Sequence, residues 1–341
     1  MAILVTGGAG YIGSHTTLAL LEAGYQVIIV DNLTTSHFDS VLRLQKLAGE
    51  VIDFYVGDIR DKHFLHSVFS SNNIESVIHF AGLKSVGESV VLPIKYYDNN
   101  VSGTLNLISE MIQHNIHHLI FSSSATVYGN PEKIPLEECS RIGGTTNPYG
   151  TTKLMVEQIL DDVTAVYPEF RTTILRYFNP VGAHPSGEIG EDPNGIPNNL
   201  MPYICQVAIG KHKQLSVLGS DYPTKDGTGI RDYIHVMDLA EGHVAALERR
   251  NEGPNHKVYN LGTGTGYSVL EVLNAFERVT SYAVPYILSE RRPGDIAECW
   301  SDPTKAQKEL GWKAQRGLED MIRDAWNWQQ KNPNGYKKPD S

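Results

Sequence analysis

A glycine-rich turn follows the first apolar run and constrains the possible fold more than any other feature of the chain. Residues 2–6 are apolar, and Thr6-Gly7-Gly8-Ala9-Gly10-Tyr11-Ile12-Gly13 comes next, before a stretch with helical spacing. Glycines allow a tight turn and a close approach of backbone to a pyrophosphate, and the following helix presents free N–H groups. The turn therefore predicts a strand–turn–helix unit that binds a dinucleotide. The residues expected at the diphosphate are Gly7, Gly10, Tyr11, Ile12 and Gly13.

The alternation of short apolar runs with helical patterns continues through the first half of the chain. The expected strands are 2–6, 26–30, 51–56, 76–80, 118–123 and 172–177. The expected helices lie near 11–23, 38–48, 61–71, 95–115 and 149–167. Such alternation predicts an α/β fold of the Rossmann type, a doubly wound parallel sheet with helices on both faces.

The pattern changes after about residue 180, where proline and glycine become dense and the expected elements become shorter. We therefore expect residues 1–180 to form a dinucleotide-binding domain. Residues 181–341 are expected to form a smaller mixed α/β lobe for the substrate, with some chain returning to the first domain. Ligands of open α/β sheets bind beyond the carboxyl ends of the strands, so the cleft between the lobes is the expected site.

An aspartate at the end of the second expected strand indicates which dinucleotide the turn prefers. Asp31 follows the apolar run 27–30, about 20 residues beyond the glycines, where this kind of site places an acidic residue. A carboxylate there accepts hydrogen bonds from ribose hydroxyls and repels a 2′-phosphate, so NAD is expected rather than NADP. Further cofactor candidates follow the strands at the same edge. They are Asn32, Asp58, Ile59, Phe80, Ala81 and Gly82.

Tyr149 and Lys153 form a YxxxK pair in the fifth expected helix. Residues four apart share one helix face, so the Lys153 ammonium can stand beside the Tyr149 phenol. A nearby ammonium is expected to lower the tyrosine pKa from about 10 toward neutrality. Tyr149 could then accept a proton from a substrate hydroxyl while hydride leaves the same carbon. The run 122–124, three serines at the end of the fifth expected strand, supplies a hydroxyl that could bridge Tyr149 and the substrate oxygen.

Composition and charge narrow the class of partner. The chain has 341 residues, of which 41% are hydrophobic and 20% charged, and its formal net charge is -10. An acidic globular chain is a poor partner for nucleic acid, and no segment approaches the roughly 20 apolar residues of a membrane span. The widely spaced Cys139, Cys205 and Cys299 indicate neither a disulfide framework nor a CxxC metal site. We expect a cytoplasmic protein without nucleic-acid partner, membrane segment or metal.

Several longer stretches together resemble a known group of proteins. They are 77–84 (VIHFAGLK), 122–129 (SSSATVYG), 176–183 (RYFNPVGA), 198–202 (NNLMP) and 226–236 (DGTGIRDYIHV). Over nearly its whole length the chain is similar to extended short-chain dehydrogenases/reductases, and specifically to UDP-glucose (UDP-galactose) 4-epimerases. The resemblance implies tightly held NAD, UDP-hexose substrates and a homodimer formed through helices such as 95–115 and 149–167.

The resemblance also implies roles for individual side chains. Tyr149 is the implied base, Ser124 assists it, and Lys153 holds the nicotinamide ribose and tunes Tyr149. The other implied cofactor residues are Lys84, Asn99, Ser122, Tyr177 and Phe178. The other implied substrate residues are Lys84, Asn179, Asn199, Leu200, Arg231, Arg292, Asp295 and Cys299.

The implied reaction is the interconversion of UDP-glucose and UDP-galactose through a transient 4-keto sugar. Cys299 extends this expectation to UDP-N-acetylglucosamine and UDP-N-acetylgalactosamine. In the resembling enzymes a small residue at this position goes with acceptance of acetamido sugars, and a tyrosine goes with their exclusion. The physical reason is volume, because a packed pocket does not yield easily to an added group.

Two rival functions remain open from the sequence. Sugar-nucleotide 4,6-dehydratases share the fold but carry an Asp-Glu pair after the active-site threonine, where this chain has Ser124-Ala125-Thr126 and no acid pair. A non-enzymatic NAD-binding redox sensor is the second rival. Such proteins often lose the tyrosine or lysine of YxxxK, and this chain has both.

Overall fold

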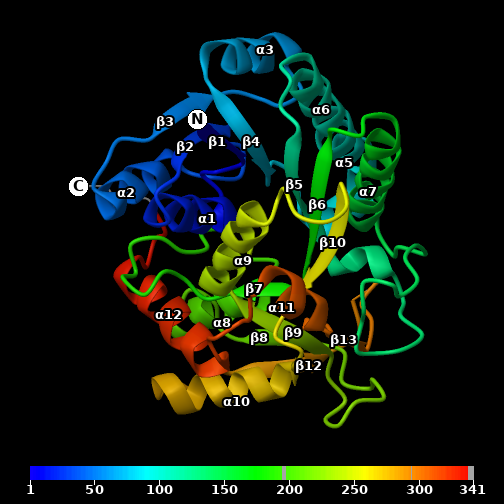
Figure 1. The fold of residues 1–341 in the computed structure, drawn as a ribbon. Helices are drawn as coiled ribbons and strands as arrows, with labels where there is room; N and C mark the ends of the chain where they lie inside the picture. The colour runs from blue at the N-terminus through cyan, green and yellow to red at the C-terminus, as the bar shows by residue number, and fades with distance from the viewer. Residues whose placement is uncertain (194–196, 293, 337–341) are drawn as a thin grey trace.

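A seven-stranded parallel sheet forms the centre of the computed structural model, which describes residues 1–193, 197–292 and 294–336 (Figure 1). The strands follow the order β10-β6-β5-β4-β1-β2-β3. Their bounds are β1 Ala2–Thr6, β2 Gln26–Asp31, β3 Asp53–Val56, β4 Ile74–His79, β5 His118–Ser124, β6 Arg171–Tyr177 and β10 His256–Leu261. The predicted Rossmann-type fold is confirmed.

Helices cover both faces of this sheet (Figure 1). One face carries α1 (Tyr11–Glu22), α2 (Phe38–Ala48) and α9 (Val236–Glu248), and the other carries α3 (Lys62–Ser71), α6 (Gly103–Gln113) and α7 (Pro148–Val166). Successive side chains of a strand point to opposite faces. Ile3 and Val5 therefore join the core beneath α1, whereas Leu4 joins the core beneath α3 and α6.

Two elements from the second half of the sequence, β10 and α9, complete this sheet and one of its helical layers. β10 pairs in parallel with β6 and so forms an edge of the sheet. α9 packs against α1, so the helix that opens the glycine-rich unit is covered by chain far away in sequence. The strand–helix pattern of the first half alone does not reveal these two elements.

The stretch expected as a helix near 95–115 is helical without a break in the structure, as predicted, but it contains a π-helical segment that the prediction did not include. α5 (Pro93–Tyr97) leads into a π-helical segment, η1 (Asp98–Ser102), before α6 begins, and α4 (Val86–Val91) precedes them. Apolar spacing does not distinguish a π-helical turn from an α-helical one. Such turns are frequent at functional sites, and here the segment contains the buried Asn100.

The remaining elements form a smaller mixed lobe, as predicted. β7 (Asn179–Val181), β9 (Ile230–His235), β11 (Gly266–Ser268) and β13 (Glu298–Cys299) make one sheet, and β8 (Leu215–Leu218) pairs with β12 (Tyr286–Ser289). α8 (Leu200–Ala208), α10 (Val269–Thr280) and α12 (Leu318–Lys331) pack around a separate core, and α11 (Thr304–Leu310) packs on β10. None of the helices in the described ranges is both long and apolar enough to cross a bilayer.

Candidate active site

The glycine-rich turn packs too closely for any side chain at two of its positions. Gly7 has φ +73°, and a Cβ there would lie 2.6 Å from the backbone nitrogen of Ala81. A Cβ on Gly13 would lie 2.2 Å from the carbonyl oxygen of Gly7. The first turn of α1 therefore packs directly on the glycine-rich loop, and this loop packs directly on the chain at the end of β4. Only glycine fits at these two positions.

The N-terminus of α1 fits a diphosphate. Gly10 precedes the helix without a side-chain cap, and the first turn carries no acidic residue. The N–H groups of this turn therefore lack a side-chain acceptor, and the helix dipole adds positive potential there. The Tyr11 hydroxyl donates to the carbonyl of Gly182 at 2.7 Å, which ties the turn to the chain after β7.

Asp31 lies buried at the end of β2 and fixes the same turn. Its Oδ2 accepts from the Ala9 N–H at 3.1 Å, and its Oδ1 accepts from the Leu33 N–H at 2.9 Å and the Ser36 hydroxyl at 2.8 Å. Burial raises the pKa of the Asp31 carboxyl, and these hydrogen bonds oppose that rise. A carboxylate offers about four acceptor positions, so capacity remains for the hydroxyls of a ribose.

Asn32 and Asp58 meet just beyond the ends of β2 and β3. Asn32 Nδ2 donates to Asp58 Oδ2 at 2.9 Å, and Asp58 accepts two bonds from the Arg60 guanidinium, at 2.8 and 2.9 Å, and one from the Arg60 N–H at 2.9 Å. The Arg60 guanidinium holds the pKa of Asp58 well below its usual range. Ile59 is buried against Gly103 at the start of α6. These candidates therefore share the carboxyl edge of the sheet with Asp31.

Asn100 fixes the loop after β4, although the family resemblance implies a role only for its neighbour Asn99. Asn100 Oδ1 accepts from the Leu83 N–H at 2.8 Å, and its Nδ2 donates to the Leu83 carbonyl and the Thr152 hydroxyl, both at 3.0 Å. Asn99 Nδ2 donates to Asn100 Oδ1 at 2.9 Å. The π-helical turn determines which of the two adjacent asparagines points inward. The sequence does not reveal this turn, so it does not indicate which asparagine is buried.

The same loop is held from the side of the glycine-rich turn. The N–H groups of Phe80 and Ala81 both donate to the carbonyl of Thr6, at 2.9 and 3.0 Å. A Cβ on Gly82 would lie 3.7 Å from Lys153 Nζ. The loop therefore connects the glycine-rich turn to the YxxxK helix.

Local signals at the start of α7 position Tyr149 and Lys153. Asn147 caps the helix by accepting from the Gly150 N–H at 2.9 Å, and Pro148 occupies its first position. Both residue types are favoured there. Tyr149 and Lys153 consequently lie one turn apart on one face, with Lys153 Nζ 6.0 Å from the centre of the Tyr149 ring.

Burial dominates the ionisation of this pair. It raises the pKa of Tyr149, although a hydrogen bond with Ser124 opposes the rise, and it lowers the pKa of Lys153 to about 8. The expectation that Lys153 brings the tyrosine pKa toward neutrality is therefore wrong for the chain by itself. The physical reason is the burial of the phenol, while Lys153 Nζ lies 6.0 Å from the centre of the Tyr149 ring and donates to the Ser122 carbonyl at 2.6 Å.

Ser124 ends β5 beside this pair. Its hydroxyl oxygen accepts from the N–H of Thr126 at 3.2 Å and from the Thr126 hydroxyl at 3.0 Å. These bonds cap the short 3-10 segment η2 (Ala125–Tyr128). The Ser124 hydroxyl hydrogen thus remains available for the substrate or for Tyr149.

Behind the pair, a buried ion pair fixes α7 to the sheet. Glu157 on α7 binds Arg176 on β6 with a closest N–O distance of 2.7 Å, and the Ser123 hydroxyl donates to Glu157 at 2.5 Å. Tyr177, next along β6, pairs through its hydroxyl with His243 of α9. The strand that supports the active site is therefore held on both faces.

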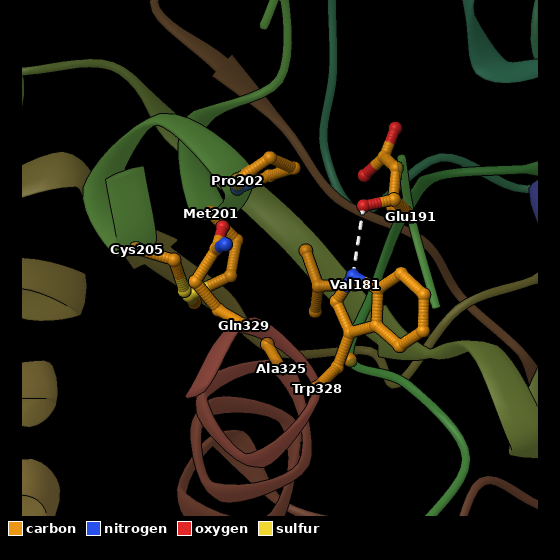
Figure 2. A pocket seen from close by; sticks show the side chains of 9 residues that line it. Val181, Glu191, Met201, Pro202, Cys205, Ala325, Trp328 and Gln329 are labelled. Atoms are coloured by element: carbon orange, nitrogen blue, oxygen red, sulfur yellow. Dashed lines mark hydrogen bonds between the residues drawn. The ribbon is translucent and has the colours of Figure 1, made fainter. Parts of the chain in front are cut away.

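Lys84 and Asn199 converge on Glu191, which carries no signal in the sequence pattern. Lys84 Nζ lies 3.0 Å from Glu191 Oε1, and Asn199 Nδ2 donates to the same oxygen at 2.6 Å. Leu200 follows as the first residue of α8. The Glu191 main chain accepts from the Trp328 indole at 3.1 Å, beside a small cavity between α8 and α12 (Figure 2).

The other predicted substrate residues gather on the sheet of the second lobe and the chain leading to it. Cys299 on β13 is the register partner of Arg231 on β9, and Asn179 of β7 is the partner of Tyr233. The pairing brings these three strands side by side. Arg292 and Asp295 form an ion pair at 2.8 Å shortly before β13.

Cys299 is buried where the second lobe meets the chain that follows Ser124. It belongs to one apolar cluster with Phe178, Ala125, Tyr128 and Leu136. Burial raises the pKa of its thiol to about 11, so the side chain is a small neutral group. The cluster contains residues that directly follow Ser124, which places Cys299 near the reacting groups.

Comparisons with known proteins agree with this geometry. The NAD dependent epimerase/dehydratase family matches residues 3–262. The UDP-glucose 4-epimerase of Pasteurella multocida (strain Pm70) is 61% identical over 337 residues, 99% of this chain and 100% of the relative. The crystal structure of UDP-glucose 4-epimerase from Bifidobacterium longum in complex with NAD+ and UDP has a TM-score of 0.96 at 55% identity, covering 98% of this chain and 100% of that one.

A more distant solved structure is named for two substrates. The UDP-Glc/GlcNAc 4-epimerase from Campylobacter jejuni has a TM-score of 0.84 at 36% identity, covering 97% of this chain and 99% of that one. Family match, full-length identity and fold all agree. The chain belongs to the NAD-dependent epimerase/dehydratase family and, within it, to the UDP-glucose 4-epimerases.

Proposed function

We propose that the protein is an isomerase that interconverts UDP-glucose and UDP-galactose with NAD as a prosthetic group. The observation that carries the proposal is the meeting of Ser124, Tyr149 and Lys153 beside the glycine-rich turn, at the carboxyl edge of the sheet. Identity of 61% to a UDP-glucose 4-epimerase over nearly the whole chain supports the same substrate pair.

The residues of the chain would handle the proton and the orientation of the sugar. Tyr149 accepts the proton of the sugar 4-hydroxyl, Ser124 shares the hydrogen bond to that oxygen, and the Lys153 ammonium stabilises the phenolate. When bound, NAD+ supplies the hydride acceptor and a positive charge. Return of the hydride to the other face of the 4-keto sugar inverts carbon 4. Asp31 and the first turn of α1 would hold the ribose and the diphosphate.

A product assay with UDP-galactose separates this proposal from its rivals. The proposed enzyme gives UDP-glucose at equilibrium without added NAD. A 4,6-dehydratase gives a dehydrated keto sugar, and a redox sensor gives no product. Ala125 and Thr126 stand where a dehydratase would need acidic side chains after its threonine, so this rival is not favoured.

We propose that the UDP moiety is held mainly by the second lobe. The fixed fork of an arginine matches the geometry of phosphate oxygens, and Arg231 and Arg292 supply positive charge to a chain whose formal net charge is -10. Asp295 orients Arg292 through their ion pair. The other proposed contacts are Asn179, Asn199 and Leu200. Lys84 would reach the sugar nucleotide from the first lobe.

We further propose that the enzyme accepts UDP-N-acetylhexosamines, because Cys299 leaves room for an acetamido group. The Campylobacter jejuni structure, whose name includes UDP-GlcNAc, supports such breadth on this fold. The variant Cys299→Tyr should sharply lower turnover of UDP-N-acetylglucosamine and largely spare UDP-galactose. Cys205→Ser, a change at a buried cysteine on α8, is the matched control. An equal loss on both sugars in Cys299→Tyr would refute the pocket argument and leave the epimerase proposal standing.

We propose that residues 1–180 form the domain that holds NAD and that residues 181–341, apart from α9 and β10, form the lobe that holds the UDP-sugar.

We also propose that the protein is a homodimer formed through α6 and α7. Leu105 on α6 and Met155 on α7 are exposed by 46% and 44%, and exposed apolar side chains on adjacent helices suit an interface. Sedimentation analysis should show a dimer for the parent and a monomer for Leu105→Asp with Met155→Asp. Leu288→Asp on β12 is the control, and an unchanged dimer in the double variant would contradict the proposed interface.

The proposed location is the cytoplasm. The three cysteines are free in the structure, which is typical of proteins in a reducing compartment. The formal net charge of -10 does not suit a nucleic-acid partner. Fractionation of cells that produce the protein at natural levels would test this.

A further inference from the structure

A group of metal-ligating side chains lies between α3 and α6, away from the proposed active site. His66 comes from α3, and Glu110 and His114 come from the end of α6, one turn apart. α6 ends where the chain turns back toward the start of β5. The group therefore lies near the amino edge of the sheet, whereas Ser124 marks the carboxyl end of β5.

The distances between the ligand atoms match a tetrahedral metal site. His66 Nδ1 lies 3.1 Å from Glu110 Oε2, His114 Nε2 lies 3.6 Å from the same oxygen, and the two ring nitrogens are 3.4 Å apart. Zinc bonds to imidazole nitrogen and carboxylate oxygen are about 2.0–2.1 Å long, which makes the edge of a regular tetrahedron about 3.3–3.4 Å. A single ion at the centre can thus reach all three atoms without rearrangement of the helices.

The charges of the group also favour a cation. The Glu110 side chain is only 8% exposed, so its carboxylate lies largely out of water and faces the two imidazoles. Hydrogen atoms on both facing ring nitrogens would oppose each other at 3.4 Å. A cation can instead accept the lone pairs of both facing ring nitrogens and of the carboxylate at once.

The surroundings complete the features of a metal site. His66 Nε2 contacts the Ser70 hydroxyl at 3.4 Å, so the ring nitrogen that does not face the group has an outer partner. The Phe69 ring packs against His114 with centroids 5.6 Å apart and limits its movement. The His66 side chain is 50% exposed. Water can therefore reach the fourth coordination position and an ion can enter from solvent.

We propose that His66, Glu110 and His114 bind one divalent transition-metal ion, with zinc as the expected ion in the cell. Two imidazoles and one carboxylate suit zinc, cobalt, nickel or copper, whereas magnesium and calcium prefer oxygen ligands throughout. The ion links α3 to α6 and so ties two helices on the same face of the sheet. It is structural, and the proposed epimerase reaction does not use it. The proposal departs from the expectation of a protein without metal, because that expectation considered cysteine spacing, whereas these ligands are histidine and glutamate from two helices far apart in sequence.

Isothermal titration calorimetry on untagged protein, stripped of metal with chelator, tests the proposal. A Cys139→Ser background removes the exposed thiol as a competing ligand. Zinc should bind with a stoichiometry of one per chain and raise the thermal unfolding midpoint, because it binds only the folded arrangement. Cobalt should show the visible absorption of a four-coordinate ion.

Glu110→Gln and His66→Ala are the decisive variants. Glu110→Gln preserves side-chain shape, and His66 is a surface residue, so both should fold. Each should weaken zinc binding by more than about 100-fold, since loss of an outer partner alone costs about 10–100-fold. His63→Ala, at an exposed position in α3, is the matched control and should bind as the parent does. No saturable binding by the parent, or binding retained in both variants, would overturn the proposal.

Discussion

Replacing Asn100 by alanine would remove the side chain that holds the loop over Lys153. The change deletes four hydrogen bonds, one of them from Asn99, and leaves the N–H and the carbonyl of Leu83 without their partner. Asn100 and Leu83 are both buried, so water cannot readily replace the lost bonds. Leaving a buried polar group unsatisfied costs about 1–3 kcal/mol. The two orphaned backbone groups should together lower the free energy of unfolding by about 2–6 kcal/mol.

The unfolding midpoint should fall by about 4–12 °C in Asn100→Ala, at about 2 °C per kcal/mol for a large domain. Turnover of UDP-galactose should fall as well, because Gly82 in the same loop lies close to Lys153. Differential scanning calorimetry and a coupled product assay measure the two effects.

Asn106→Ala is the matched control for this change. Asn106 lies on α6 and donates to the carbonyl of Arg60 at 3.0 Å in a solvent-exposed setting. Its loss should cost no more than about 0.5 kcal/mol, as surface substitutions usually do. Equal losses of stability in the two variants would refute the role of Asn100 in holding the loop.

Further predictions concern the cofactor turn and the YxxxK pair. Tyr149→Phe should reduce kcat by about 10²–10⁴-fold, the usual effect of losing a general base, and full activity in the stopped-flow product assay would exclude Tyr149 as the base. Lys153→Met should slow the reaction yet raise the unfolding midpoint at pH 7. The pKa of Lys153 is lowered to about 8 in the folded chain, so the cost of its buried charge is fully present below pH 8 and fades as pH rises toward the ordinary lysine pKa of about 10.4; an equal midpoint difference at pH 7 and pH 10 would contradict this. Gly13→Ala, whose Cβ would lie 2.2 Å from the Gly7 carbonyl oxygen, should yield protein that releases no NAD on denaturation, as liquid chromatography can check.

The sequence predicts the main sheet well because its signals are local. The runs at 2–6 and 118–123 become β1 and β5 almost without change, since strands buried on both faces contain continuous apolar stretches, here 2–5 and 119–121. The glycines of the first turn are equally readable, because backbone contacts at Gly7 and Gly13 exclude every larger residue.

What the sequence does not predict depends on contacts between distant segments. β10 reaches β6 from the second half of the chain, and Glu191 meets Lys84 across the two lobes. Asn100 is set inward by a π-helical turn that apolar spacing cannot reveal. The pKa of Tyr149 cannot be predicted from the Tyr149–Lys153 pair alone, because burial in the folded chain raises it by more than the hydrogen bond with Ser124 lowers it.

The fate of the hydrogen on carbon 4 tests the central claim most directly. If NAD takes this hydrogen as hydride and returns it, the hydrogen never exchanges with solvent. Epimerisation of UDP-galactose in D2O, followed by proton NMR of the UDP-glucose formed, should therefore show full protium at carbon 4. Deuterium at that carbon would mean that the bond breaks by loss of a proton, and it would contradict the proposed roles of NAD and Tyr149.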